Sequence, residues 1–159
     1  MIGLKWYHGV IFYVVVTILS GSWLSTSEYL DSQGRPPFMP PDYVFPPVWI
    51  VNNILMIWAG LRIANKPEDF SAKKQLLWLQ AVVWLGFVSF SWCYFALHSP
   101  ILAAGVALIM WGANFATVLL AYPKDKAISF SLFPLLIWLS LASAIAIYQA
   151  IYTTDELFN

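Results

Sequence analysis

Residues 36–49 of this chain read PPFMPPDYVFPPVW, and an apolar segment, IVNNILMIWAGLRI, follows at residues 50–63. Six prolines and four aromatic residues fall within those fourteen positions. Proline cannot continue a helix or a central strand, but it fits the first turn of a helix. The stretch therefore predicts a stiff entrance, carrying aromatic faces, to a helix that begins at about residue 46.

The composition of the whole chain is that of a membrane protein. Its 159 residues are 60% hydrophobic and 10% charged, whereas a soluble domain is about 45–50% apolar and about 25% charged. A run of roughly 20 apolar residues marks a helix that crosses a bilayer. Five such runs predict an all-α membrane protein, a five-helix transmembrane bundle forming a single domain over residues 1–159. The predicted spans are about residues 8–24, 46–63, 75–97, 101–122 and 128–152.

Two other interpretations of the apolar runs are weaker. Lys5 precedes an apolar stretch that ends in Ser20-Gly21-Ser22, an order that is also found in signal peptides. The length of the stretch, the bulky Trp23 beside the would-be cleavage site and the apolar runs that follow favour a span. A membrane barrel needs strict alternation of apolar and polar residues, and these runs are continuous, so helices are the remaining solution.

The basic residues predict an orientation. With five spans, the N-terminus and two of the loops share one side of the membrane, and this side holds seven basic residues, while the other side holds only Arg35. Basic residues gather on the cytoplasmic side. We therefore expect a cytoplasmic N-terminus and an external loop at residues 25–45, with a bacterial inner membrane as the location and an organellar membrane as the alternative.

Several kinds of chemistry have no matching residues in this sequence. No charged residue lies in the middle of a run, which argues against active transport. Cys93 is the only cysteine, so it forms neither an internal disulfide nor a zinc site. His8 and His98 lie at the ends of runs, where a histidine is more often interfacial than a metal ligand. We expect no catalytic residue, no metal site and no nucleic-acid partner.

Polar and small residues inside the runs have a structural interpretation. Polar side chains there hydrogen-bond between helices. Asn52 and Asn53 are adjacent, so at most one of them is expected to point into a central cavity. Small residues at spacings of three and four predict close helix contact, either within the chain, in a homodimer or with another membrane protein. These small residues are Gly86, Ser89, Cys93 and Ala96.

Three stretches carry a resemblance to a known family, and together they extend it over about residues 6–152. Residues 40–49, PPDYVFPPVW, are similar to the entrance PPxWVFxPVW of the TspO/MBR family of tryptophan-rich sensory and translocator proteins. Residues 95–103, FALHSPILA, resemble the family's turn FGLHSPxLA. Residues 134–144, PLLIWLSLASA, resemble its segment PYLxWVSFATA.

The resemblance implies a five-helix receptor with a pocket among the helices and a lid formed by the loop at residues 25–45. Its ligands would be porphyrin or haem, or a sterol-like molecule. The resemblance places Trp49, Trp138 and Ala142 in the pocket and Pro40 and Pro41 in the lid. The full set of candidate ligand-binding residues is Phe38, Pro40, Pro41, Phe45, Trp49, Phe87, Phe90, Trp138 and Ala142.

The chain also departs from the family pattern at these positions. Phe87 stands where the family has a pocket asparagine, Phe90 where it has a tryptophan, and Phe38 where the lid has a tryptophan. The resemblance therefore implies recognition of a flat apolar ligand by shape rather than by hydrogen bonds. No cofactor is required, and a porphyrin or haem would be a bound ligand.

Three functions are open on this sequence. The first is a membrane receptor or sensor for a tetrapyrrole-like molecule, acting in stress signalling. The second, implied by the resemblance, is an enzyme that degrades porphyrin photochemically. The third is a structural or interaction subunit of a larger membrane complex, in which large side chains at Phe87 and Phe90 have closed the pocket.

Overall fold

The computed structural model describes residues 3–21, 29 and 33–158, and this part of the chain is all-helical. Two short segments flank the long helices: the 3₁₀ turn η2 (Asp42–Val44) precedes α3, and the π turn η3 (Trp92–Ala96) continues α4. The predicted all-α, five-helix architecture is confirmed. The helices in the described part of the chain are α1 (Trp6–Leu19), α3 (Phe45–Ala64), α4 (Lys73–Ser91), α5 (Pro100–Ala121) and α6 (Lys126–Tyr152).

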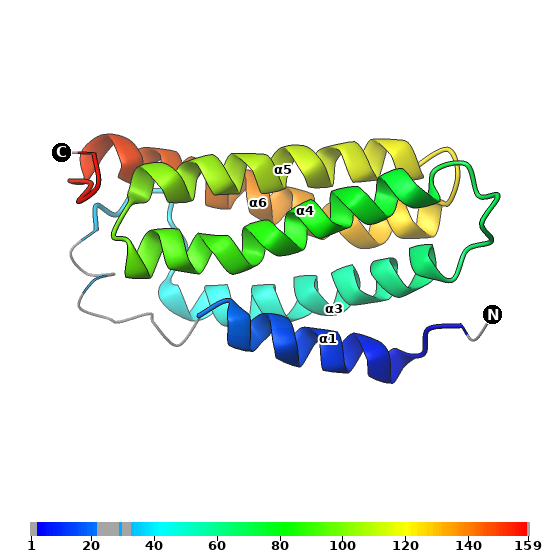
Figure 1. Cartoon of the computed structure of the whole chain (residues 1–159). Coiled ribbons are helices and arrows are strands. Elements are labelled where there is room, and N and C mark those ends of the chain that lie inside the picture. The colour runs from blue at the N-terminus through cyan, green and yellow to red at the C-terminus, as the bar shows by residue number, and fades with distance from the viewer. Residues whose placement is uncertain (1–2, 22–28, 30–32, 159) are drawn as a thin grey trace.

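The helices lie side by side along a common direction, with α1 at one edge of the bundle (Figure 1). Helix α5 packs against both α4 and α6, α3 packs against α4 and α6, and α1 contacts α3 and α4. The turn between α4 and α5 contains His98, whose φ of 47° reverses the chain. Helices α4 and α5 are therefore antiparallel neighbours.

Among the described residues, four segments are long and apolar enough to cross a membrane: Asp42–Ala64, Lys73–Ala96, Pro100–Ala121 and Lys126–Tyr152. Each has at least 22 residues, whereas about 20 residues cross a bilayer core. The protein is therefore a multi-pass integral membrane protein.

Helix α1 differs from its predicted span. It is apolar but has 14 residues, about 21 Å of helix, whereas the prediction ran from residue 8 to residue 24. A turn at Ser20 and Gly21 follows the helix, where Gly21 takes a φ of 62°. Glycine adopts this left-handed conformation without strain. Residues 22–24 of the predicted span lie outside the described residues.

The helices α3, α5 and α6 begin within two residues of their predicted first residues. Prolines or capping side chains define these three helix starts. Pro46 and Pro47 stand in the first turn of α3, as the entrance sequence predicts. The Ser99 side chain caps α5 by accepting a hydrogen bond from the Leu102 backbone N–H, and the Asp125 side chain accepts one from Ala127 at the start of α6. The predicted third span, residues 75–97, is α4 together with η3, where the Leu97 N–H bonds the Trp92 carbonyl at 2.9 Å.

The interior of the bundle holds both large apolar and small residues. Met56, Leu76, Leu132 and Leu139 are among the fully buried side chains, while large apolar side chains such as Trp78 point outward, as in a helix bundle surrounded by lipid. Gly86 of α4 faces α5 so closely that a Cβ atom there would lie 2.3 Å from Met110 Cγ. The contact predicted for the small residues is therefore made within the chain at Gly86.

A charge cluster joins the ends of α3 and α6. Asp125 Oδ2 lies 2.6 Å from Lys66 Nζ and 2.9 Å from Arg62 Nε, and the Asp125 side chain is 7% exposed. Burial acts to raise the pKa of Asp125, but hydrogen bonds from Lys66 and Arg62 outweigh it and lower this pKa to about 2. The carboxylate therefore fixes the start of α6 against the end of α3.

A buried carboxylate closes the opposite end of the bundle. Asp155, which is fully buried, accepts hydrogen bonds from the Ser99 hydroxyl at 2.7 Å and from the Ile101 N–H at 3.0 Å. It also accepts hydrogen bonds from the backbone N–H groups of Leu157 and Phe158. These bonds outweigh the effect of burial, and the pKa of Asp155 lies below its usual value. The segment after α6 is thereby attached to the first turn of α5.

Candidate ligand site

Four aromatic residues from three helices meet inside the bundle and form what we call the aromatic cluster: Phe45, Trp49, Phe87 and Trp138. The rings of Trp49 and Trp138 lie edge-on, with centroids 6.3 Å apart. Phe45 lies 5.2 Å from Trp138, and Phe87 lies 5.3 Å from Trp49. All three contacts are of the edge-to-face type that aromatic pairs prefer.

The entrance sequence positions the α3 side of this cluster. The two prolines that follow Phe45 fit the first helical turn, so Phe45 and Trp49 stand four residues apart at the start of α3. Residues four apart share a helix face, and this face meets α6 at Trp138, which is 7% exposed. The proline-rich stretch therefore directs two aromatic side chains to one point in the bundle.

Two residues that were not predicted from the sequence extend the aromatic cluster. Trp84 lies 5.9 Å from Phe87 on α4, and Phe12 of α1 lies 5.0 Å from Trp84. The spacing of three residues between Trp84 and Phe87 was available as a signal, because residues three apart share a helix face. The contact of Phe12 depends on how α1 packs, which no local pattern reveals.

Buried polar atoms without hydrogen-bond partners occur on the helices that form the cluster. They include the Trp138 indole Nε1, the Ser143 hydroxyl and the side-chain oxygens of Asn52 and Asn53. Both asparagines are 2% exposed, so both side chains are covered, although adjacent positions point in different directions. A buried polar group without a partner costs about 1–3 kcal/mol, so these atoms are available to a ligand.

The described part of the predicted lid is anchored on α6 and the segment that follows it. Phe38 contacts Tyr148 edge-on at 6.3 Å, and the Gly34 N–H donates to Thr153 Oγ1 at 3.3 Å. Pro40 and Pro41 lead into η2, where the Val44 N–H bonds the Pro41 carbonyl at 2.9 Å. Residues 25–28 and 30–32 of the predicted lid lie outside the described residues.

The structure distributes the nine predicted site residues over several places. Phe45, Trp49, Phe87 and Trp138 come together, while Phe38, Pro40 and Pro41 lie in the anchored segment ahead of α3. Phe90 packs with a second group of buried residues, Ala104, Ala107 and Ala146, and stacks on Tyr94 at 5.7 Å. Ala142 is partly buried on α6, four residues after Trp138. Ligand contact at all nine positions stays a prediction.

Two of the hollows among the described residues have linings that include none of Phe45, Trp49, Phe87 and Trp138. One, of about 410 Å³, lies at the end of α3, and the other, of about 360 Å³, lies between α1, α3 and α4. Within the cluster, Phe87 contacts Trp49 on one side and Trp84 on the other. The cluster is therefore packed closed by Phe87.

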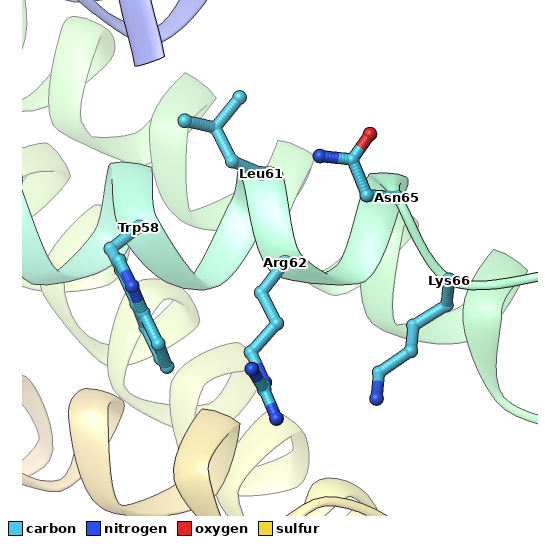
Figure 2. A pocket seen from close by; sticks show the side chains of 5 residues that line it. All are labelled: Trp58, Leu61, Arg62, Asn65 and Lys66. Carbon is cyan, nitrogen blue, oxygen red and sulfur yellow. The ribbon is translucent and has the colours of Figure 1, made fainter. Parts of the chain in front are cut away.

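The hollow at the end of α3 is a charged surface feature. Figure 2 shows Trp58, Arg62 and Lys66 pointing to one side of α3, and Leu61 and Asn65 pointing to the other. The Arg62 guanidinium lies 5.4 Å from the Trp58 ring centroid, and both Arg62 and Lys66 bind Asp125. These two cations therefore hold helices together.

Metal-binding chemistry has no support among the described residues. They contain no group of three His, Cys, Asp or Glu side chains that could hold a metal ion. His8 Nδ1 lies 3.0 Å from the Lys5 backbone nitrogen, and His98 Nδ1 lies 3.0 Å from Glu156 Oε1. Neither ring contacts the aromatic cluster in a described interaction.

The fold and the aromatic cluster define a multi-pass helical membrane protein with an aromatic interior. The sequence model of the TspO/MBR family matches residues 9–151, so this chain belongs to the TspO/MBR family. The resemblance noted from the three sequence stretches is confirmed.

The chain is similar to the following two proteins. The tryptophan-rich protein TspO of Chlorobaculum tepidum is 29% identical over 120 residues, which cover 74% of each chain. The protein CrtK of Rhodobacter capsulatus is 27% identical over 132 residues, which cover 79% of each chain. The chain therefore matches these relatives over most of their length.

Proposed function

We propose that this protein is a membrane receptor that binds a flat hydrophobic molecule, such as a porphyrin or haem, against Trp49 and Trp138 inside the helix bundle. Membership of a family of sensor- and receptor-like membrane proteins supports this function. The observation that carries the proposal is the pair of edge-on indoles, one of which is buried with its N–H unpartnered.

Aromatic walls suit a flat ligand for a physical reason. The planes of the two indoles are nearly perpendicular, so a planar ligand between them stacks on the face of one indole and meets the edge of the other. It buries apolar area on both sides, which stabilises the complex by about 25 cal/mol per Å². Trp49 and Trp138 come from different helices, so a ligand between them also joins α3 to α6. Such a contact lets binding change the packing of the helices, as a receptor requires.

The unpartnered polar atoms supply orientation. The Trp138 N–H can donate to a carbonyl or carboxylate of the ligand, and the unpartnered side-chain oxygen of Asn52 or Asn53 can accept a hydrogen bond from it. Phe87 and Phe90 stand on α4 where the family pattern has an asparagine and a tryptophan, so those amide and indole groups are missing from this chain. The two asparagines on α3 are buried. The proposed recognition is therefore mainly by shape, with a small number of polar contacts.

Binding requires the closed cluster to open. Phe87 occupies the space between Trp49 and Trp84, and Phe45 lies beside Trp138 at the junction of η2 and α3. We propose that the ligand displaces the Phe87 ring and that the segment of residues 33–45 moves with Phe45. No residue of the cluster is an iron ligand, so the macrocycle and not an iron atom is the group recognised.

The location that fits this function is a bacterial inner membrane, with the N-terminus in the cytoplasm and the loop at residues 25–45 outside. The seven-to-one distribution of basic residues supports this orientation. The segment ahead of α3 would then meet ligands that arrive from the external side.

The proposal is tested by titrating protoporphyrin IX into the protein in lipid nanodiscs, with empty nanodiscs as the control for partition into lipid. The Soret absorbance gives the dissociation constant. The double variant Trp49→Leu/Trp138→Leu should bind roughly tenfold more weakly, since each lost aromatic contact is worth about 0.5–1.5 kcal/mol. The matched control, Trp6→Leu/Trp78→Leu, removes two indoles that are 74% and 73% exposed. Equal affinity in the two double variants would contradict the proposed site.

One observation favours a second function. Because Phe87 fills the cluster, the chain could act as an interaction subunit whose pocket has closed, with its exposed apolar helix faces packed against another membrane protein or a second copy. Absence of saturable porphyrin binding, together with co-purification of a partner in constant ratio, would favour that function. If porphyrin does bind, illumination with detection of products distinguishes a receptor from a photochemical enzyme.

A further inference from the structure

The hollow of about 360 Å³ between α1, α3 and α4, which we call the α1–α3–α4 groove, is not lined by Phe45, Trp49, Phe87 or Trp138, but it adjoins them through Trp84, which lines the groove and contacts Phe87. The α4 part of its lining runs from Leu77 to Trp84, about 10 Å of helix. Apart from His8 and Gln80, its side chains are apolar. The lining residues on which the argument depends are Gly9, Phe12, Ile57, Gln80, Ala81 and Trp84.

Two close contacts hold α1 beside the groove. A Cβ atom on Gly9 would lie 2.4 Å from Ile57 Cγ2, so α1 and α3 touch where α1 has no side chain. Phe12 of α1 meets Trp84 of α4 edge-on at 5.0 Å. The groove thus has walls from three helices, and its shape is fixed by packing.

One polar side chain in this apolar lining has no partner. Gln80 is 4% exposed, and both its Nε2 and its Oε1 lack a hydrogen-bond partner. The other buried glutamine on a helix, Gln149, accepts a hydrogen bond from the Tyr94 hydroxyl at 3.0 Å. In the hydrocarbon region no bulk water satisfies such a group, so the Gln80 amide offers a donor and an acceptor, side by side, to a molecule in the groove.

We propose that the α1–α3–α4 groove binds a single-chain fatty acid whose protonated carboxyl group pairs with the side-chain amide of Gln80. The carboxyl O–H donates to Oε1, and the Nε2–H donates to the carboxyl C=O, so both atoms of the amide gain a partner. The apolar lining contacts the acyl chain. Burial in an apolar site disfavours the ionised form of a carboxyl group, which is why the acid binds in its neutral form.

The size and the chemistry of the groove both select this occupant. Small-molecule sites measure about 300–1,000 Å³, so a volume of about 360 Å³ fits one chain better than a macrocycle. An ester only accepts hydrogen bonds and would leave Oε1 of Gln80 unpaired. A phospholipid or a methyl ester is therefore a weaker ligand than the free acid.

The test uses 12-bromododecanoic acid with the full-length protein in nanodiscs, because bromine quenches a nearby indole and Trp84 lines the groove. Quenching should be saturable, should fall in Trp84→Phe, and should occur at roughly tenfold higher concentration in Gln80→Leu, as expected for the loss of about 1.4 kcal/mol. Filling the groove with Ala81→Phe should abolish the saturable part. The control, Gln75→Leu, replaces an exposed glutamine on the same helix and should match the wild type.

Two related probes determine whether the head group is recognised. 12-Bromododecanamide also presents a donor and an acceptor and should bind like the acid, whereas methyl 12-bromododecanoate should bind about as weakly as the acid binds to Gln80→Leu. Quenching that does not saturate, or that is the same in wild type, Gln80→Leu and Ala81→Phe, would show partition into lipid only and would overturn the proposal. Equal binding of the acid and its methyl ester would also overturn it.

Discussion

Trp49 of α3 and Trp138 of α6 lie edge-on at a centroid distance of 6.3 Å and an interplanar angle of 88°, with Phe87 of α4 against Trp49. This contact joins three helices at the point where the proline-rich entrance leads into the bundle. The aromatic cluster therefore links the segment ahead of α3 to the interior of the bundle.

Phe87→Ala should bind protoporphyrin IX more tightly than the wild type. The Phe87 ring fills the space between Trp49 and Trp84, so a ligand no longer has to displace it. The variant should also lose on the order of 2 kcal/mol of stability, since the ring is only partly buried and a fully buried one is worth 3–5 kcal/mol. Soret titration and thermal unfolding measure the two effects.

The matched control is Phe90→Ala, on the same helix but in the group of Ala104, Ala107 and Ala146. It should lower stability and leave the affinity for protoporphyrin unchanged. If Phe87→Ala binds no better than Phe90→Ala, Phe87 does not block the ligand site.

Asp125→Asn should weaken the junction of α3 and α6 at neutral pH. Asparagine still caps α6, but it loses its ion pairs with Arg62 and Lys66. The pKa of Asp125 is about 2 in the folded protein, below its ordinary value of 3.8. The ionised carboxylate therefore stabilises the folded state fully above about pH 4, and this stabilisation is lost as the pH falls through 2. The shift corresponds to about 2 kcal/mol.

Thermal unfolding between pH 7 and pH 2 measures this contribution. The wild type should be more stable than Asp125→Asn at neutral pH, and this difference in stability should disappear between about pH 4 and about pH 2. Asp42→Asn, which removes an exposed pair with Arg35, is the control and should change stability by less than about 1 kcal/mol. A constant difference between wild type and Asp125→Asn over the whole pH range would contradict the assignment.

Asp155→Asn should loosen the segment after α6. The buried carboxylate accepts hydrogen bonds from the Ser99 hydroxyl and the Ile101 N–H at the start of α5. Hydrogen bonds to a charged group are worth about 1.5–3 kcal/mol, so the loss should be about 2 kcal/mol. Hydrogen exchange at Ile101 and Leu157 should become faster. Glu156→Gln, at an exposed pair with His98, is the control that should leave exchange unchanged.

Gly86→Ala should destabilise the contact of α4 with α5. A Cβ atom at this position would meet Met110 Cγ at 2.3 Å and Sδ at 2.9 Å, so the methionine must move. Gly112→Ala on α5 meets nothing within 4 Å and should be neutral or slightly stabilising, because alanine favours a helix by about 1 kcal/mol over glycine. A lower melting temperature for Gly112→Ala than for Gly86→Ala would contradict the close contact.

The sequence allowed most of the helix limits to be predicted, because local residues define them. Prolines at positions 46, 47 and 100 and the capping groups of Ser99 and Asp125 act within one helical turn. The end of α1 was predicted too late, because Trp23 and Leu24 were counted in the span although Ser20-Gly21-Ser22 separate them from the apolar run, and the helix ends at Leu19. The π turn at Trp92–Ala96 likewise has no local signature.

Membership of the cluster was predicted only in part. Phe45, Trp49, Phe87 and Trp138 meet, but Phe90, one turn further along α4 than Phe87, packs against small residues of α5 and α6 instead. Trp84 and Phe12 belong to the same chain of ring contacts and were missed. Which rings meet depends on how far each helix is rotated and shifted against its neighbours, and the residues of a single helix do not determine this.

The most direct test of the proposed function is ¹⁹F NMR of the protein labelled with 5-fluorotryptophan, recorded in nanodiscs with and without protoporphyrin IX. Single substitutions to phenylalanine assign the resonances of the nine tryptophans. We predict that the signals of Trp49 and Trp138 shift and saturate together, while those of Trp6 and Trp78 stay in place. Shifts confined to Trp6, Trp78 and other exposed indoles, with Trp49 and Trp138 unchanged, would contradict a ligand site in the aromatic cluster.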